Sequence, residues 1–251
     1  MKQKTAIITG GSRGLGRDMA LNLAQDGVNI IFSYHSNQNK ANEVISEIEA
    51  MGQKAAAFPF DANNPKSGQD FINKATNYLQ QENGSKNFDF LINNAGTGTF
   101  NLVPDTTEVQ FDEMMNIHLK SVYFLTQAAI PYLNKGGRII NISSGLARFS
   151  LPGMSAYAMM KGGIEVFTRY LAKELGKRNI TANVIAPGAI ATDFAGGSNK
   201  DKEKADLISS ITALGRVGKA EDIGGTVAFL CSKKAGWING QRIEVSGGML
   251  V

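Results

Sequence analysis

Short apolar segments alternate with longer segments of helical period along most of this sequence. The apolar segments, such as Ala6-Ile7-Ile8 and Phe90-Leu91-Ile92, have no polar alternation, which is typical of strands buried on both faces. Strands that alternate with helices in this way form a parallel sheet with crossover helices. We therefore predict an α/β fold with strands at residues 6–9, 28–34, 55–60, 88–92, 138–142, 181–185 and 242–245, and helices at 17–26, 39–51, 67–80, 107–133, 156–177 and 221–231.

A glycine-rich segment, Thr9-Gly10-Gly11-Ser12-Arg13-Gly14-Leu15-Gly16, lies between the first predicted strand and the first helix. Glycines let the backbone turn sharply, and they let a diphosphate reach the amides of a helix N-terminus, where the helix dipole favours negative charge. The spacing is G-x3-G-x-G and not the general G-x-G-x-x-G. Its position nevertheless favours a dinucleotide site in a Rossmann-type, doubly wound parallel sheet with helices on both faces. It argues against the eight-stranded βα barrel, which alternates in the same way.

No linker or composition break divides the chain, so residues 1–251 are expected to form a single dinucleotide-binding and catalytic domain. Residues 189–213, rich in small and charged side chains, are the predicted substrate loop. The scattered charges, 26 Lys+Arg against 22 Asp+Glu, form no basic stripe with aromatic side chains and argue against nucleic-acid binding. No apolar run reaches the roughly 20 residues of a membrane span.

One cysteine, Cys231, and two histidines leave almost nothing for a metal site, and we expect none. A single cysteine also excludes an internal disulfide and suits a reducing compartment. The first residues contain no apolar signal region. We therefore expect a cytoplasmic protein.

Tyr157 and Lys161 begin a predicted helix at a spacing that places both side chains on one face. A lysine ammonium beside a phenol stabilises the phenolate and lowers the tyrosine pKa. Such a tyrosine can exchange a proton with an alcohol or ketone oxygen near neutral pH.

Further motifs occur in a fixed order: Asn93-Asn94-Ala95-Gly96 after the fourth strand, Ser144 before Tyr157, Pro187-Gly188 with Thr192, and Ser246-Gly247-Gly248. With the glycine loop and the Tyr157–Lys161 pair, this order resembles the short-chain dehydrogenase/reductase family over essentially the whole chain. The resemblance implies a Rossmann-type fold, a nicotinamide cofactor and an Asn-Ser-Tyr-Lys tetrad.

The resemblance assigns four catalytic roles. Tyr157 would be the general acid/base, and Lys161 would hold the nicotinamide ribose and lower the tyrosine pKa. Ser144 would hydrogen-bond the substrate oxygen, with Ser143 as the competing candidate. Asn116 would support a water-linked proton path to the lysine. We interpret His118 as structural, since nothing in the sequence pairs with it.

The resemblance also implies the residues that bind the cofactor. Asp61 and Ala62 would meet the adenine. Strand 28–34 ends without the carboxylate that would bind the ribose 2′-hydroxyl of NAD. Arg13, together with His35 and Ser36, could instead bind a 2′-phosphate. We therefore expect NADP(H) in preference to NAD(H). The remaining cofactor-binding residues are Gly10, Ser12, Gly14, Leu15 and Gly16 in the glycine loop, Asn93, Ala95 and Gly96 along the groove, and Tyr157, Lys161, Pro187, Gly188, Ile190 and Thr192 around the nicotinamide.

The substrate side of the predicted pocket is apolar and suits an uncharged ketone or alcohol, or an acyl chain; the residues are Leu146, Phe149, Leu151 and Met154. Among the subgroups of the family, the sequence most resembles the 3-oxoacyl-carrier-protein reductases. It is also similar to glucose dehydrogenases and carbonyl reductases. Lys135 and Arg178 fall where the acyl-carrier reductases have basic residues, so an acyl-carrier protein is a candidate partner. The resemblance also implies a homotetramer. The alternative from another class is a dinucleotide sensor without catalysis, against which the presence of Tyr157 and Lys161 argues.

Overall fold

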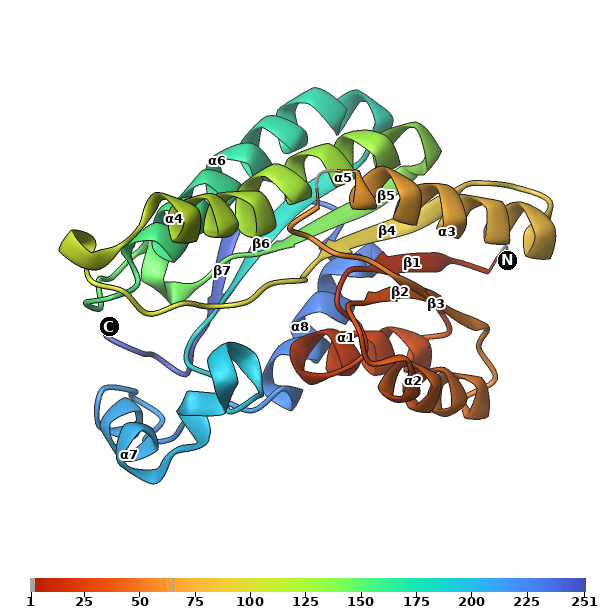
Figure 1. Ribbon diagram of the computed structural model, residues 1–251. Coiled ribbons are helices and arrows are strands. Elements are labelled where there is room, and N and C mark those ends of the chain that lie inside the picture. Colours follow the sequence, from red (N-terminus) through yellow and green to blue (C-terminus); the bar gives the residue numbers. More distant parts are fainter. Residues whose placement is uncertain (1–2, 65) are drawn as a thin grey trace.

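A single sheet of seven parallel strands forms the centre of the computed structural model, which describes residues 3–64 and 66–251 (Figure 1). The strand order is β3-β2-β1-β4-β5-β6-β7. This order reverses direction between β1 and β4, where an open α/β sheet has its ligand crevice at the carboxyl ends of the strands. The strands are β1 (Thr5–Ile8), β2 (Asn29–Tyr34), β3 (Ala55–Pro59), β4 (Phe88–Asn93), β5 (Leu133–Ile142), β6 (Thr181–Pro187) and β7 (Arg242–Val245).

Helices cover both faces of the sheet (Figure 1). One face packs against α1 (Gly14–Gln25), α2 (Gln38–Ala50) and α8 (Glu221–Cys231). The other packs against α3 (Ser67–Asn83), α5 (Ser121–Ala129) and α6 (Ser155–Leu175), with α4 (Glu108–Met115) beside α6. Within residues 3–64 and 66–251, the longest helices are too short or too polar to span a bilayer. The parallel seven-stranded sheet with helices on both faces confirms the predicted Rossmann-type, doubly wound fold.

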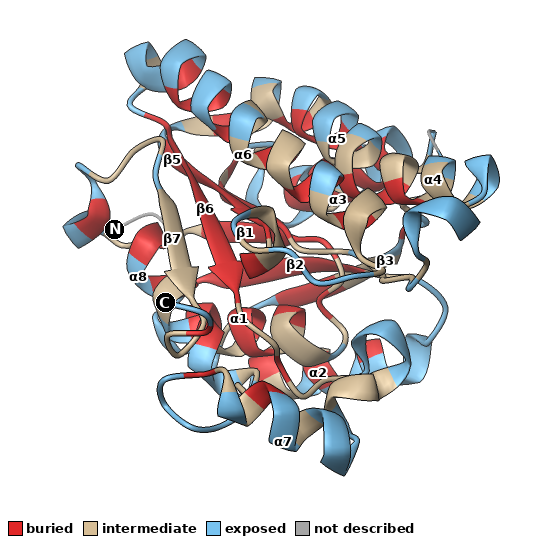
Figure 2. Cartoon of the chain, turned by 90° about the vertical axis from the view of Figure 1, so that its left-hand side faces the viewer, coloured by how far each residue is buried: buried red, intermediate tan, exposed pale blue. Residues whose placement is uncertain are grey.

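The core has two apolar layers because successive side chains of a buried strand point to opposite faces. In β1, Ala6 and Ile8 pack with Met19 and Leu23 of α1, whereas Ile7 packs toward the opposite layer. Figure 2 shows the central strands buried between the helices, while the edge strand β7 is only partly covered. The central strands are therefore held from both sides, and their carboxyl ends form a fixed platform.

The structure divides the predicted helix 107–133. Helix α4 is followed by a π-helical turn, Asn116–Lys120, and then by α5 and a short turn, Ile130–Tyr132. Strand β5 starts at Leu133, earlier than the predicted 138, because Leu133 pairs with Phe88 across a register shift. Helical turns therefore cover nearly the whole predicted range 107–133, but they do not form the single regular α-helix that was predicted.

The predicted substrate loop 189–213 is more ordered than its sequence indicates. It contains a 3-10 segment, Phe194–Lys200, and the helix α7 (Lys202–Ser210), whose N-terminus is capped by the Asp201 side chain. Ala195, Gly196 and Gly197 all have positive φ angles, of 50°, 75° and 78°. This left-handed turn leads the chain from β6 to α7, which lies apart from the central sheet in Figure 1.

Candidate active site

A cleft of about 690 Å³ opens at the carboxyl ends of the strands, where the sheet order reverses. Its size and its mostly apolar lining with a few polar groups are typical of a small-molecule site. The walls are the glycine loop 10–16, the segments 60–63 and 94–97, residues 142–161 in part, and the segment 187–199 in part. Residues far apart in the sequence thus meet at one end of the sheet.

The glycine loop is shaped so that α1 starts at the cleft wall. Gly10 and Gly14 have positive φ angles of 71° and 55°. A side chain at Gly16 would place its Cβ 2.1 Å from the Gly10 carbonyl oxygen and 2.6 Å from Asn94 Nδ2, so only glycine fits there. Arg13, which precedes α1, gives the helix no side-chain cap within the part of the chain that the structure describes. The first N–H groups of α1 are therefore available to a diphosphate, and the loop fits a dinucleotide.

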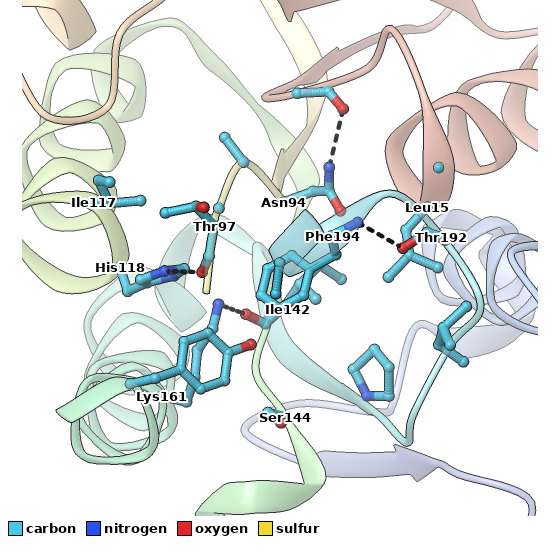
Figure 3. A pocket seen from close by; sticks show the side chains of 18 of the residues that line it. Leu15, Asn94, Thr97, Ile117, His118, Ile142, Ser144, Lys161, Thr192 and Phe194 are labelled. Carbon is cyan, nitrogen blue, oxygen red and sulfur yellow. Dashed lines mark hydrogen bonds between the residues drawn. The ribbon is translucent and has the colours of Figure 1, made fainter. Parts of the chain in front are cut away.

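Tyr157 and Lys161 lie one turn apart on α6 and are both buried, with 7% and 5% of their surfaces exposed. Lys161 Nζ donates a 2.7 Å hydrogen bond to the Ile142 carbonyl, as Figure 3 shows, and lies 5.5 Å from the centre of the Tyr157 ring. Ser144, two residues after the end of β5, lies close enough to the Tyr157 phenol to lower its pKa. The cleft thus brings together the three residues that the sequence predicts as acid/base, lysine and substrate-binding serine.

Ser143, the competing serine, is occupied elsewhere. Its hydroxyl donates to Glu165 Oε1 at 2.8 Å, and it is 2% exposed. Both serines line the cleft, but the hydroxyl that lies close enough to Tyr157 to lower its pKa is that of Ser144. The geometry therefore favours Ser144 as the serine that a substrate oxygen would meet.

The electrostatics of the pair differ from the expectation. Burial raises the pKa of the Tyr157 phenol above its ordinary value, and the nearby Ser144 hydroxyl offsets only part of that rise. Burial lowers the pKa of Lys161 to about 8. Desolvation of the phenol therefore acts against the predicted lowering of the tyrosine pKa, while the Lys161 ammonium lies beside the ring and is bonded to Ile142; the lowering by Lys161 stays a prediction.

Most of the predicted cofactor residues line the cleft. Arg13 and His35 lie at one end, and Asp61 with Ala62 at the mouth beside β3. The others on the wall are Gly10, Ser12, Gly14, Leu15, Gly16, Ala95, Gly96, Pro187, Gly188, Ile190 and Thr192.

Three predicted residues lie off the cleft wall: Ser36, Asn93 and Asn116. Ser36 follows the end of β2 and is exposed. Asn93 is the last residue of β4 and points into the sheet layer, where its amide donates to Thr126 and Asn141. The Asn116 amide donates to Asn63 Oδ1 at 3.3 Å. Asn93 therefore does not line the groove as predicted, whereas the role of Asn116, which depends on its position in the helix, stays a prediction.

Three residues that sequence reasoning missed do line the cleft: Asn94, His118 and Phe194. Asn94 Nδ2 donates to the Thr9 carbonyl at 2.9 Å and so ties the glycine loop to β4. Its position after Asn93 in the Asn-Asn-Ala-Gly motif was a usable signal. His118 packs edge-to-face on Tyr157, with ring centres 4.9 Å apart, and the sequence offers no signal for that contact.

The substrate end of the cleft is apolar as predicted, with Leu146, Phe149, Leu151 and Met154 on its wall. Phe194, from the predicted substrate loop, lies 5.9 Å from the Tyr157 ring centre to centre. It also packs over Gly98, where a Cβ would come within 2.9 Å of the Phe194 ring. An aromatic side chain therefore borders the position of the phenol from the loop side.

A cluster of ion pairs holds the backbone at Ser144 and the residues near the C-terminal end of the sequence. Arg242 donates to Glu165 at 2.7 Å, to Glu244 at 2.7 Å and to the Ser144 carbonyl at 3.2 Å. Arg148 pairs with Glu244 at 2.7 Å and also donates to two backbone carbonyls, those of Met249 and Leu250. The hydrogen bond from Arg148 is the main reason that the pKa of Glu244 is lowered to about 2. Residues 249–250 are thereby fixed beside the cleft.

Metal chemistry has no ready ligand set here. Within residues 3–64 and 66–251, no group of three or more His, Cys, Asp or Glu side chains could hold an ion together.

Comparisons with known proteins point to one kind of enzyme. A family model described as enoyl-(acyl carrier protein) reductase matches residues 10–250. The 3-oxoacyl-[acyl-carrier-protein] reductase FabG of Staphylococcus aureus is 38% identical over 248 residues, which is 98% of this chain and 98% of that protein.

Two solved structures share the fold closely. The angucycline C-6 ketoreductase LanV with bound NADP is 34% identical and superposes with a TM-score of 0.94 over 98% of this chain and 95% of its own. A short-chain dehydrogenase/reductase from Serratia marcescens is 32% identical, with a TM-score of 0.92 over 99% of this chain and 98% of its own. Each of these similarities extends over nearly the full length of both chains.

Proposed function

The chain belongs to the short-chain dehydrogenase/reductase family of oxidoreductases, and on that basis we propose that it is an NADP(H)-dependent ketoreductase for uncharged ketones. The observation that carries this proposal is the group formed by the buried Tyr157 and Lys161 and the half-buried Ser144 in the cleft beside the glycine loop. A reductase needs a proton donor and an oxygen-binding group beside a dinucleotide site, and this group supplies both.

Each residue of the group has a distinct proposed task. Ser144 orients the substrate carbonyl oxygen by a hydrogen bond, and Tyr157 donates its phenolic proton to that oxygen during reduction. Lys161 lies beside the phenol, and its charge favours the phenolate that forms as the proton leaves. NADPH, when bound, supplies the hydride that reaches the carbonyl carbon. In the oxidative direction Tyr157 takes the proton back.

The cofactor would lie along the cleft with its diphosphate on the α1 amides. Arg13 and His35 would border the 2′-phosphate, and Asp61 with Ala62 the adenine. Thr192 and Ile190 would border the nicotinamide. Bound NADP in LanV, 34% identical to this chain, supports the choice of cofactor. Ser36 and Asn93, which lie off the wall, are not needed for this arrangement.

We propose that Asn116 supports a water-linked proton path to Lys161 through its position in the helix. Asn116 begins the π-helical turn, and its carboxamide donates to Asn63.

The apolar substrate end favours a ketone with a hydrophobic body over a sugar. Leu146, Phe149 and Met154 offer no hydrogen bonds to the several hydroxyls of a sugar, so a glucose-type dehydrogenase is the weaker alternative. A dinucleotide sensor without catalysis would have no need of the Tyr157–Lys161 pair.

A specific observation favours a second candidate, reduction of a 3-oxoacyl group on an acyl-carrier protein. The FabG relative has that activity in its name and is 38% identical to this chain. The two proposed docking cations differ in availability, however. Lys135 is exposed, whereas the Arg178 guanidinium donates to the carbonyls of Ile130 and Leu133 and is half-buried. Only Lys135 is free to meet an acidic partner.

We also propose a homotetramer in the cytoplasm. The outer sides of α5 and α6 expose aromatic side chains, including Tyr123, Phe124 and Tyr170, of which Tyr170 is 63% exposed. Apolar patches of this kind mark interfaces between subunits. Cys231 is buried, and burial raises its thiol pKa to about 12, so the thiol is unreactive.

A parallel substrate screen tests the proposed function. NADPH consumption is followed with bulky aromatic and aliphatic ketones, 3-oxoacyl thioesters with and without a carrier protein, and sugars. We expect the uncharged ketones to give the highest kcat/KM. The Tyr157→Phe variant should lose turnover by about 100-fold or more while NADPH affinity changes little. Turnover only with carrier-linked substrates would favour the second candidate, and unchanged turnover in Tyr157→Phe would contradict the mechanism.

A further inference from the structure

Arg148 makes a set of contacts that the mechanism above does not use. It lies four residues after Ser144, is exposed, and lies off the cleft wall. Nε and Nη2 of its guanidinium donate to the two carboxylate oxygens of Glu244 at 2.8 and 2.7 Å. Nη2 also donates to the Met249 carbonyl at 2.8 Å, and Nη1 donates to the Leu250 carbonyl at 3.0 Å. Such a set of hydrogen bonds needs the planar fork of an arginine, because a lysine ammonium is a single point of charge.

Residues 246–250, which follow β7, depend on Arg148 for their conformation. Leu250 has a φ angle of 52°, in the left-handed region that residues other than glycine rarely adopt. Its side chain is 39% exposed, so burial contributes little to holding it. Instead, its N–H donates to the Ile211 carbonyl at 2.9 Å, and its own carbonyl accepts from Arg148. A strained backbone persists only where its surroundings determine it, and Arg148 supplies one of these two anchors.

The same residues pair with the end of the predicted substrate loop. Residues 212–214 lie antiparallel to residues 247–249, with N–H···O distances of 3.0 and 3.1 Å. They follow α7, whose buried Ile208 lines the cleft. Figure 1 shows the end of the chain marked C below α4 and above α7 in the view. One short segment, held by Arg148, therefore connects the substrate loop to the turn that carries Ser144.

Two residues held by Arg148 lie on the cleft wall. Met249 lines the cleft and is 2% exposed. Its N–H donates to the Ser246 hydroxyl at 3.3 Å and its carbonyl accepts from Arg148, so what it offers to a ligand is its apolar side chain. Phe149 also lines the cleft, and the Arg148 guanidinium lies over its ring, 5.3 Å from the ring centre. This cation–π contact and the bond to Met249 tie two apolar wall residues to one arginine.

We propose that Arg148 is a positioning residue that limits the length of the substrate, with Met249 as the wall that the apolar arm of the ketone reaches. Arg148 holds Phe149 and Met249 at a fixed separation and keeps residues 246–250 from moving outward. The site then favours ketones whose hydrophobic body ends at Met249 over ketones with long alkyl or acyl chains. A fixed apolar wall discriminates well, because one methylene group in such a pocket changes kcat/KM by about 10–200-fold. This role rests on the proposed ketoreductase function and names the class of ketone.

Three variants separate this role from a general effect on folding. Arg148→Gln removes the fork and leaves a polar side chain at an exposed position. Met249→Ala shortens the wall residue and leaves the arginine contacts, which are made to backbone carbonyls and to Glu244. Arg17→Gln is the matched control, because Arg17 pairs with Glu47, has a similarly exposed side chain, 42% against 38%, and lies off the cleft wall. Thermal unfolding reports whether each variant folds.

The first measurement needs no substrate. Hydrogen exchange followed by mass spectrometry reports the local opening of residues 211–214 and 246–250, which are bonded to one another through backbone amides. In Arg148→Gln we expect both segments to exchange about 10-fold faster, an effect kept small by the exposure of the guanidinium. In Arg17→Gln both segments should exchange as in the wild type. Unchanged exchange of both segments in Arg148→Gln would overturn the proposal.

The second measurement is kcat/KM for ketones that share one reacting group and differ in the length of an alkyl arm. The wild type and Arg17→Gln should show a sharp fall at the same length. In Met249→Ala the fall should come about three carbon atoms later, the length that the methionine side chain loses. In Arg148→Gln the ratio of kcat/KM between short and long ketones should decrease by about 10-fold, mainly through a lower KM for the long ketones. A wild-type ratio in both variants would overturn the proposal.

The two measurements distinguish this proposal from the proposed function. A wild type that reduces no ketone would contradict the ketoreductase function, while the exchange result on the ligand-free protein still decides whether Arg148 holds residues 246–250. A wild type whose kcat/KM rises steadily up to long acyl chains would leave the ketoreductase function intact and overturn the assignment of Met249 as the wall.

Discussion

Replacing Arg13 with alanine tests the proposed preference for a 2′-phosphate. Arg13 is exposed beside the N-terminus of α1 and lines the cleft with His35. Strand β2 ends at Tyr34, and no carboxylate follows before Glu43. The charges of Lys40 and Arg13 both help to lower the pKa of Asp193, after the dominant effect of its partner Lys200. Positive charge from two elements therefore gathers at this end of the cleft.

The expected magnitude follows from the exposure of the guanidinium. A hydrogen bond to a charged group contributes about 1.5–3 kcal/mol, and solvent around an exposed side chain favours the lower end, about 1.5–2 kcal/mol. This range equals a loss of about 10–30-fold in kcat/KM for NADPH. NADH has no phosphate at this position, so its kcat/KM should change by less than about twofold. Added salt should weaken NADPH binding more than NADH binding, since only the phosphate contact is screened strongly.

The assay is kcat/KM with both cofactors at fixed ionic strength, for the wild type, Arg13→Ala and Arg17→Ala. Arg17 is a matched control because it also lies near the start of α1, but it pairs with Glu47 and does not line the cleft. Arg17→Ala removes the same charge and should leave the ratio of the two cofactors unchanged. Equal losses for NADPH and NADH in Arg13→Ala, or a wild type that prefers NADH, would refute the reasoning.

Three further predictions concern the cofactor loop, the lysine and the assembly. Gly16→Ala should raise the NADPH dissociation constant by more than about 10-fold, because its Cβ would collide with the Gly10 carbonyl oxygen. The control Gly162→Ala places its Cβ in open space on α6 and should leave the dissociation constant unchanged. Fluorescence titration of NADPH measures both constants. The pKa of Lys161 is about 8 in the folded protein, against an ordinary value of 10.5. Between these two pH values the unfolded chain binds more protons than the folded protein, so the free energy of unfolding should rise with pH in that range. Chemical denaturation of wild type and Lys161→Met should show this rise only in the wild type, and parallel curves would disprove the burial of a titrating lysine. Light scattering should give a tetramer for the wild type and a smaller species for Tyr170→Glu, and a monomeric wild type would contradict the proposed assembly.

The positions of the strands and the cleft could be predicted because they depend on local patterns. Uninterrupted apolar runs, as in Phe90-Leu91-Ile92, identify buried parallel strands, and each predicted strand is present. The glycine loop identifies the end of the sheet at which a dinucleotide binds, because only there do a strand, a tight turn and a helix N-terminus coincide. The Tyr157–Lys161 spacing places both side chains on one helix face, and both line the cleft.

The errors arise where the side-chain direction depends on a local irregularity. Asn93 and Asn94 are neighbours, yet alternation along β4 sends Asn93 into the layer beneath the sheet, and only Asn94 reaches the glycine loop. The prediction of a regular helix over 107–133 did not include the π-helical turn at Asn116–Lys120. That turn changes the direction of its side chains and brings His118 against Tyr157. The raised tyrosine pKa reflects burial, which depends on packing across several elements and leaves no mark in the sequence.

The contacts of Arg148 have a consequence for the order in which the protein can become active during synthesis. Its partners, Glu244 and the carbonyls of Met249 and Leu250, come 96 to 102 residues later in the chain. Arg242, which supports the Ser144 carbonyl, comes 98 residues after that serine. A nascent chain that has already formed the elements from β1 to α6 would therefore have the phenol and the serine but not their support. We expect the protein to gain the competent cleft only after residues 242–250 have left the exit tunnel.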